Sequence, residues 1–369
     1  MKSSFGNSIE VQIFGESHGK AIGAVINGLA PGIPLDIDFI NKQMNKRKPQ
    51  GNISTQRKET DEIIFLSGYF NGYTTGTPLC FMIENNAQHS KDYSELKYLL
   101  RPSHADFTAY AKYQGFQDYR GGGHFSGRIT APMVAVGAIC MQILKVKGIE
   151  IGTHIARMKQ ITDTSFAIHE QALRDQITAL DETYFPTISK QTGEEMINMI
   201  ESAHRQGDSL GGILESVILG VEPGIGEPYF DSIESILSHL LFSIPGIKGV
   251  SFGSGFDFAN MQGSTANDSF YYEKESKKIK TVTNHNGGIN GGISNGMPIL
   301  IQCAIKPTPS IYQVQQTVNI DTNEETTLQI TGRHDPAIIH RARVVVDSML
   351  AFGILDLYCA RYGYLWMVK

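Results

Sequence analysis

Several loops of this sequence combine glycine with arginine, histidine, serine and aspartate. Guanidinium groups bind phosphate and carboxylate oxygens in bidentate fashion, and glycine lets backbone N–H groups approach an anion closely. A histidine in such a loop suits proton transfer, because its ordinary pKa is about 6.5. The pattern therefore predicts a site for a small molecule with several negative charges. The loops are residues 15–19, 101–106, 120–128, 286–296, 306–310 and 332–336.

The signatures of common nucleotide, metal and hydrolase sites are missing from the sequence. Gly15 and Gly19 are separated by three residues, whereas a phosphate-binding loop needs four. Ala21 occupies the position where that loop carries serine or threonine for magnesium. No GxGxxG motif follows an expected strand, and HExxH and GxSxG are absent. The four cysteines are scattered singly, so we predict no metal site, and a phosphoryl-transfer enzyme is disfavoured.

The composition is that of a folded, slightly acidic protein. Apolar residues make up 41% and charged residues 19%, and 32 basic against 37 acidic side chains give a net charge of −5. Proteins that bind nucleic acid or membrane surfaces usually carry a basic excess, so we expect neither partner. The apolar run at residues 129–144 is too short to span a bilayer, and no signal-peptide core is evident. We therefore expect a cytoplasmic protein.

A mixture of strands and helices is expected to hold these loops. Helices are predicted at residues 36–46, 167–180 and 194–205, and Met196, Met199 and Ile200 favour a buried helix face over a cofactor contact. These elements lack the regular β–α alternation of a doubly wound sheet, so the predicted fold class is α+β. Strands are predicted at residues 11–14, 24–26, 63–66, 79–83, 213–221 and 299–305.

Three further helices have recognisable starts. Ser103 and Asp106 fit a capping box at the head of one helix. Thr130, two residues before a proline, fits an N-cap at the start of the apolar run. Asp335, directly before a proline, fits the same pattern. By this pattern alone Asp335 is only a helix cap, a role worth about 1 kcal/mol.

Taken together, these segments resemble the chorismate synthases. Eight motifs occur in the order typical of the family, from residue 15 to residue 336, which makes the resemblance specific. It implies one domain over residues 1–369, with helices sandwiched between antiparallel sheets, assembled as a homotetramer. The motifs are Gly15-Glu16-Ser17-His18-Gly19, Arg101-Pro102-Ser103-His104-Ala105-Asp106, the loops 120–128, 207–212, 243–249 and 286–296, Lys306-Pro307-Thr308 and Gly332-Arg333-His334-Asp335-Pro336.

The resemblance also implies a reaction. In this family phosphate leaves C3 of 5-enolpyruvylshikimate 3-phosphate and a hydrogen leaves C6, an anti 1,4-elimination that yields chorismate in the last step of the shikimate pathway. The C6 hydrogen is not acidic, so reduced FMN is required, yet it is not consumed overall. The chain leaves little room for a reductase domain, so we expect an external flavin reductant, although some relatives reduce flavin with NADPH.

Catalytic roles follow from the resemblance position by position. His104 and His18 match the two active-site histidines of the family, which are proposed to protonate the flavin and the departing phosphate. Asp335 with Ser17 matches a pair proposed to relay the proton at flavin N5. Ser126 matches a serine at the contact between flavin and substrate.

Binding roles follow in the same way. Arg47, Arg101 and Arg128, together with Arg333, match arginines of the phosphate-rich cavity. The expected FMN contacts are His124, Phe125, Ser126, Pro245, Gly246, Gly291, Lys306, Pro307, Thr308, Pro309, Ser310 and Arg333.

The sequence departs from the family pattern at a few positions. His124 stands where many members carry arginine, Ile129 where they carry glutamate, and Asn52 near a position usually held by an anion-binding arginine. An alternative is a non-catalytic protein that binds flavin or a phosphorylated metabolite on the same scaffold. Such a protein would be expected to lose His18, His104 or Asp335, and all three are present.

Overall fold

Two five-stranded antiparallel sheets form the outer layers of the fold. The computed structural model describes residues 2–49, 53–54, 61–86, 97–167, 169–330 and 335–368. The first sheet has the order β1 (Ser4–Phe5), β2 (Glu10–Gly15), β3 (Ala21–Asn27), β7 (Leu79–Glu84) and β4 (Ile64–Ser67). The second has the order β11 (Ile247–Phe252), β16 (Ile299–Ile305), β10 (Gly212–Leu219), β8 (Glu150–Met158) and β9 (Ile161–Thr162).

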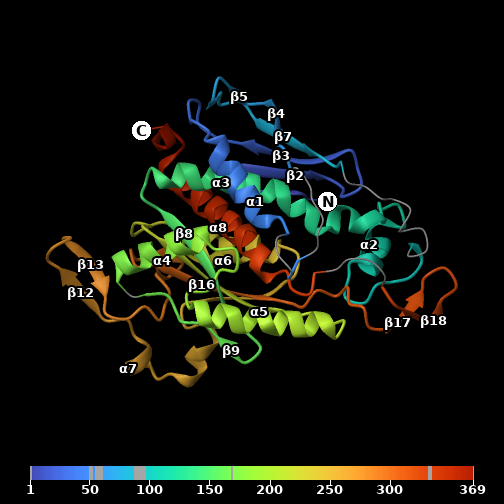
Figure 1. The fold of residues 1–369 in the computed structure, drawn as a ribbon. Helices are drawn as coiled ribbons and strands as arrows, with labels where there is room; N and C mark the ends of the chain where they lie inside the picture. Colours follow the sequence, from blue (N-terminus) through green and yellow to red (C-terminus); the bar gives the residue numbers. More distant parts are fainter. Residues whose placement is uncertain are drawn as a thin grey trace.

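Apolar helices fill the space between the two sheets (Figure 1). In β16 buried and partly exposed residues alternate, as expected of a strand with one face against a core. The helices α3 (Thr130–Lys145) and α8 (Ile339–Tyr362) are buried nearly all round. The sequence of α3 is almost unbroken apolar, as expected of such a helix, whereas α8 also buries the charged residues Arg343, Asp347 and Asp356. Helices α1 (Ile37–Arg47) and α6 (Ile233–Phe242) pack beside them. The predicted α+β class, with helices between antiparallel sheets, is confirmed.

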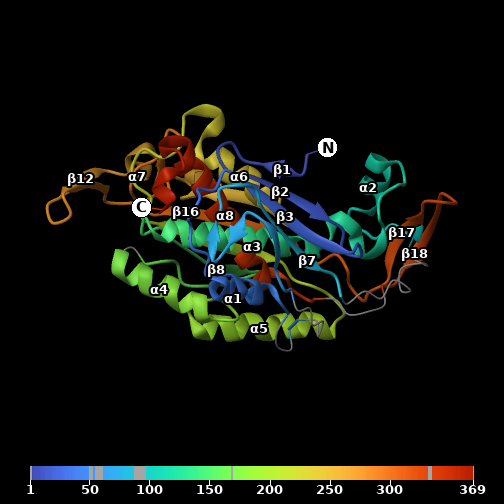
Figure 2. The same cartoon turned by 90° about the horizontal axis from the view of Figure 1, so that it is seen from above.

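The remaining elements lie around this core. Helix α4 (Glu170–Glu182) covers the second sheet with Leu173 and Ile177, and α5 (Lys190–Arg205) buries Met196 and Ile200 as predicted. Figure 2 shows α2 (Asp106–Tyr113) and the hairpin β17–β18 (Gln315–Asn319, Glu324–Leu328) at one end of the molecule and the strand β12 at the other. The short hairpins are β5–β6 (Tyr69–Phe70, Tyr73–Thr74), β12–β13 (Phe270–Glu273, Lys278–Thr281) and β14–β15 (Ile289–Asn290, Ile293–Ser294).

The three predicted helix starts are wrong in detail. Ser103 has a left-handed backbone (φ 61°), and α2 begins at Asp106 without a side-chain cap. Thr130 is the first residue of α3 and donates its hydroxyl to the carbonyl of Gly127 at 2.6 Å. Asp335 lies before α8, which begins at Ile339. In two of the three cases the carboxylate pairs with an arginine instead: Asp106 with Arg101 and Asp335 with Arg341.

The apolar run near residue 130 is a core helix. With the short turn before it, the helical stretch Gly127–Lys145 reaches 19 residues, so by length and composition alone it could cross a membrane, contrary to the expectation that it is too short. However, 78% of its most apolar window is buried inside the fold. The stretch is therefore accounted for by packing between the sheets.

A glycine allows α3 and α8 to approach each other closely. A Cβ at Gly137 would lie 2.1 Å from Ser348 Cβ and 2.3 Å from Ser348 Cα, and backbone on a packed helix cannot move aside cheaply. We expect Gly137→Ala to lower the free energy of unfolding by about 1–3 kcal/mol through overpacking. Urea unfolding measures this, with Gly263→Ala as control, because a Cβ there meets nothing within 4 Å. If both variants had the same free energy of unfolding, the close contact between α3 and α8 at Gly137 would be contradicted.

His154 is buried between two carboxylates in the second sheet. Its Nδ1 lies 2.9 Å from Asp163 Oδ2 and its Nε2 lies 3.0 Å from Glu215 Oε2, so both nitrogens donate when the ring is protonated. Asp163 also accepts the N–H groups of Ile188 and Ser189 at 2.6 and 3.0 Å, just before α5. Burial alone would lower the pKa of His154, but the two carboxylates outweigh it and raise the pKa above 6.5. The imidazolium thus joins the sheet to the start of α5.

The raised pKa predicts a pH-dependent contribution to stability. A group whose pKa is higher in the folded state stabilises fully below its unfolded pKa and loses this effect as the pH rises through its folded pKa. We expect His154→Gln to lower the free energy of unfolding by roughly 3 kcal/mol near pH 6, because buried carboxylates lose their cation. The gap between wild type and variant should narrow towards pH 9. Urea unfolding across this range tests the idea, and a constant gap would contradict it.

Candidate functional site

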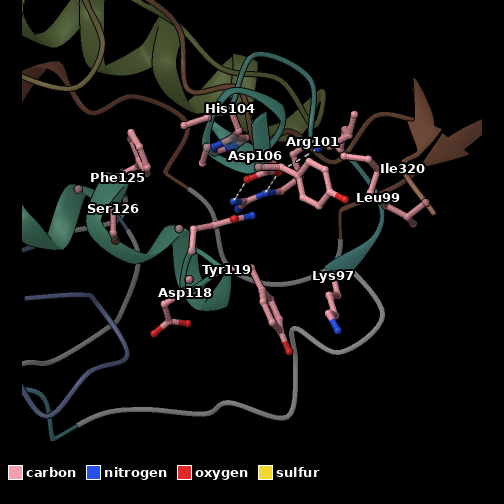
Figure 3. Close-up of a pocket in the computed structure, with 18 residues that line it drawn as sticks. Lys97, Leu99, Arg101, His104, Asp106, Asp118, Tyr119, Phe125, Ser126 and Ile320 are labelled. Atoms are coloured by element: carbon pink, nitrogen blue, oxygen red, sulfur yellow. Dashed lines mark hydrogen bonds and ion pairs between the residues drawn. The ribbon is translucent and has the colours of Figure 1, made fainter. Parts of the chain in front are cut away.

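A cavity of about 220 Å³ opens between the segment that leads into α2 and the glycine-rich loop before α3 (Figure 3). It brings together four of the predicted site residues, namely Arg101, His104, Phe125 and Ser126. The cavity is also lined by polar and aromatic residues that sequence reasoning did not single out. These include Lys97, Tyr110, Gln117, Asp118 and Tyr119.

His104 is held at this cavity by the loop after β16. Its Nε2 lies 2.8 Å from the hydroxyl oxygen of buried Ser310. Lys306 Nζ donates to the carbonyl of Ser103 at 2.7 Å. Two segments that the sequence analysis singled out separately, 101–106 and 306–310, are therefore docked on each other, and the imidazole has a fixed orientation.

His18 lies on the other side of the glycine-rich loop. Its side chain is buried, and its Nδ1 lies 3.1 Å from Ser17 Oγ. Ser17 N donates to the carbonyl of Gly123 at 3.1 Å, which docks the loop between β2 and β3 on residues 120–125. A Cβ at Gly121, which lines the cavity, would lie 2.1 Å from His18 Cε1. His104 thus lines the cavity, and His18 lies directly behind Gly121, one of the lining residues.

Three successive left-handed glycines shape the wall between the histidines. Gly121, Gly122 and Gly123 have φ values of 57°, 84° and 54°, a run that other residues rarely adopt. His124 follows them and its Nδ1 donates to the carbonyl of Gly15 at 2.8 Å. This bond fixes the position of Nδ1–H and ties the loop to the end of β2. Ser126 Oγ accepts the N–H of Arg128 at 3.3 Å.

Three of the predicted phosphate-binding arginines, Arg47, Arg101 and Arg128, lie in the described part of the chain, and each has a carboxylate partner. Arg101 donates from Nε and Nη2 to both oxygens of Asp106, at 2.8 Å each. Burial would raise the pKa of Asp106, but Arg101 outweighs it and holds the pKa below the ordinary value. Arg47 and Arg128 both bind Asp61, whose side chain is 0% exposed. Sequence reasoning missed Asp61, since nothing in its surroundings along the chain shows which arginines it meets.

Hydrogen bonds link the remaining predicted segments to the loop at residues 306–310 and to one another. Lys306 N donates to the carbonyl of Gly246 at 2.9 Å, next to Pro245. Ser209 Oγ donates to the carbonyl of Thr308 at 2.6 Å. The neighbouring Leu210 N donates to the carbonyl of Pro336 at 2.8 Å, which brings in Asp335. Asp335 itself pairs with Arg341 on α8.

One predicted cofactor residue, Gly291, is not part of this group. Gly291 lies in the turn of the β14–β15 hairpin, before the start of β16, whereas 306–310 follow its end. A strand of seven residues spans roughly 23 Å at 3.3 Å per residue, so Gly291 is remote from that loop within one chain. Arg333 lies outside the described residues, as does Asn52.

The loop at residues 306–310 has features that fit a flavin phosphate or ring edge. Thr308 Oγ1 is buried and has no hydrogen-bond partner among the described residues, and a buried unpaired hydroxyl is unfavourable unless a ligand pairs with it. Gly246 is left-handed (φ 94°), and a Cβ there would have no neighbour closer than 3.7 Å, which leaves room beside the backbone. Burial and the nearby Lys248 lower the pKa of Lys306, so positive charge gathers beside this loop. The donor set therefore fits an anionic cofactor.

Comparisons with known proteins agree on one family. The family model described as chorismate synthase matches residues 9–359. The chain is 40% identical to the chorismate synthase of Thermococcus kodakarensis, over 99% of both chains. It is 45% identical to that of Lachnoclostridium phytofermentans, over 96% of this chain and 94% of the relative. A crystal structure of chorismate synthase matches with a TM-score of 0.77 and 28% identity, covering 97% of this chain and 94% of that one.

Proposed function

The chain belongs to the chorismate synthase family of phosphate lyases, and we propose that it converts 5-enolpyruvylshikimate 3-phosphate to chorismate by an anti 1,4-elimination of phosphate. The observation that carries the proposal is that His104 lines the cavity while His18, from a distant part of the chain, lies directly behind the lining residue Gly121. Two proton donors on opposite sides of a wall of glycines suit a reaction with two separated proton requirements.

Reduced FMN, when bound, supplies electron density as phosphate leaves and recovers it as the C6 hydrogen departs. The residues proposed to hold it on this chain are His124, Phe125, Ser126, Pro245, Gly246, the loop Lys306, Pro307, Thr308, Pro309 and Ser310, and Arg333. Gly291 is also proposed, although it lies at the far end of β16 from that loop. Thr308 is the best placed of these residues to bind the flavin, because its buried hydroxyl has no hydrogen-bond partner among the described residues.

The two histidines take different roles because their neighbours differ. His104 is bonded to Ser310 in the proposed flavin loop, so it is the candidate donor to the flavin side. The loop that carries His18 is hydrogen-bonded through Asn85 to Arg128, a proposed phosphate-binding arginine. His18 is therefore the candidate donor to the departing phosphate. Ser17, 3.1 Å from His18, and Asp335, paired with Arg341, are proposed to move the proton near flavin N5.

Arg47, Arg101 and Arg128 are proposed to bind the substrate's phosphate and carboxylates. Each guanidinium is oriented by a carboxylate, and an oriented guanidinium loses little entropy when it binds an anion. The alternative function, binding without catalysis, would not need His104 at the cavity and His18 behind its lining residue Gly121.

We propose further that residues 1–369 act as one catalytic domain in the cytoplasm, within the shikimate pathway. A homotetramer would cover exposed aromatic side chains such as Phe230 and Phe256, which are 92% and 87% exposed. The reduced flavin is proposed to come from an external reductant, with NADPH-dependent reduction as the alternative. Light scattering of the purified protein tests the assembly.

An anaerobic assay tests the proposed reaction. Purified protein is mixed with photoreduced FMN and the phosphorylated substrate, and chorismate absorbance and phosphate are followed together. We expect equimolar chorismate and phosphate without net oxidation of flavin, and no product when oxidised FMN replaces the reduced form. Binding of flavin and substrate without product would instead favour the non-catalytic alternative.

A further inference from the structure

We propose that Asp61 is a positioning residue that holds Arg47 and Arg128 in place to bind the substrate's phosphate, an inference that rests on the proposed function. Its Oδ2 accepts from Arg47 Nη2 at 2.7 Å, and its Oδ1 accepts from Arg128 Nη1. One carboxylate thereby joins the last residue of α1 to the turn that opens α3.

The charges of this cluster suit an anionic ligand. Both arginines are largely buried, with side chains 11% and 8% exposed, so without a counter-charge they would repel each other. Burial would raise the pKa of Asp61, but the two arginines outweigh it and lower the pKa, which keeps the carboxylate ionised. Taken by themselves, these three described side chains, two guanidinium groups and one carboxylate, sum to a charge of +1.

The cluster is also connected to the loop that carries His18. Arg128 Nε donates to Asn85 Oδ1 at 3.1 Å. Asn85 Nδ2 in turn donates to the carbonyls of Glu16 and Gly19, at 3.0 Å each, on either side of His18. A shift of Arg128 would therefore displace both the bound phosphate and its proposed proton donor. Asp61 acts through these residues and does not itself meet the reacting atoms.

The backbone of Asp61 allows a clean test. Its φ of 51° lies in the left-handed region, which asparagine and aspartate tolerate better than other side chains with a Cβ. Asp61→Asn therefore keeps the backbone conformation and nearly the same volume, while it removes the charge and replaces one acceptor by a donor. That donor would face one of the two guanidinium groups.

We expect Asp61→Asn to raise the KM for the phosphorylated substrate about tenfold to a hundredfold, since loss of a buried charged partner has effects of this size. Its kcat should fall less, and its affinity for FMN should be unchanged. Inhibition by inorganic phosphate should weaken by the same factor as KM. The control is Asp257→Asn, which removes the same charge from an exposed position. Asp61→Glu keeps the charge and should show a smaller rise in KM.

The outcomes separate this inference from the proposed function. If wild type turns over and Asp61→Asn keeps its KM and phosphate inhibition, the role of Asp61 is wrong and the function stands. A lower KM would also overturn it, because Asp61 would then compete with the substrate's anion. If wild type shows no turnover, calorimetry with inorganic phosphate still tests Asp61 on the folded protein. Should Asp61→Asn fail to fold, Asp61→Ser serves as the variant without the charge, and an unchanged KM and phosphate affinity in it overturn the role.

Discussion

Replacement of His104 or His18 by alanine should lower kcat roughly 10²–10⁴-fold, the usual effect of removing a positioned proton donor. His104 is oriented by Ser310 at 2.8 Å and His18 by Ser17 at 3.1 Å, so each ring has a fixed direction towards the cavity wall. The two histidines are proposed to donate protons to different groups, one to the flavin and one to the departing phosphate. The histidine that remains in each single variant should therefore not compensate for the one that is replaced. Phosphate release under anaerobic conditions with photoreduced FMN measures the effect.

Stability must be separated from chemistry in these variants. His18 is buried, so its loss also opens a space, and thermal unfolding should be recorded beside turnover. His169→Ala is the matched control, because this histidine is exposed and its side chain makes no cap hydrogen bond. If both site variants turn over at nearly the wild-type rate with the fold intact, the assignment of the two acids is wrong.

Gly121→Ala should lower kcat about 100-fold, as expected when a catalytic group is displaced by about 1 Å. The added Cβ would lie 2.1 Å from His18 Cε1 and 2.4 Å from His18 Nδ1, so the imidazole has to move away from the cavity. The bond between His18 and Ser17 would be disturbed as well, since Ser17 Oγ is only 3.0 Å from the same position.

The neighbouring glycine provides the control for this variant. Gly122 is also left-handed (φ 84°), but a Cβ there would meet only Ser126 Cβ at 3.8 Å. Gly122→Ala therefore carries a similar backbone penalty without touching His18, and its kcat should stay within a few-fold of wild type. Equal losses in the two variants would mean that backbone strain, and not displacement of His18, explains the effect.

Much of the fold could be predicted from local patterns. The strand β16 and the helices α1 and α5 were predicted from patterns of near neighbours in sequence. The helix α8 was predicted from its start signal, Asp335 before a proline, although it begins at Ile339. The caps failed because Asp106 and Asp335 have arginine partners, Arg101 and Arg341, that no capping pattern takes into account. The partner that each of these side chains meets is set by the fold, and sequence spacing alone does not decide it.

The site was predictable in its parts but not in its assembly. Glycine-rich loops with arginine and histidine indicated an anion site, yet nothing local shows that His104 meets Ser310 or that His18 lies behind Gly121. These meetings depend on the order of strands in two sheets. The same topology separates Gly291 from the 306–310 loop and brings in Asp61, which has no neighbouring motif.

The most direct test of the account is a crystal structure with FMN and 5-enolpyruvylshikimate 3-phosphate bound. We expect the flavin ring and the phosphoester to lie against each other between His104 and His18, with Thr308 bonded to the flavin and the phosphate facing Arg47 and Arg128. Ligands bound elsewhere on the chain, with the two histidines in contact with neither, would contradict it.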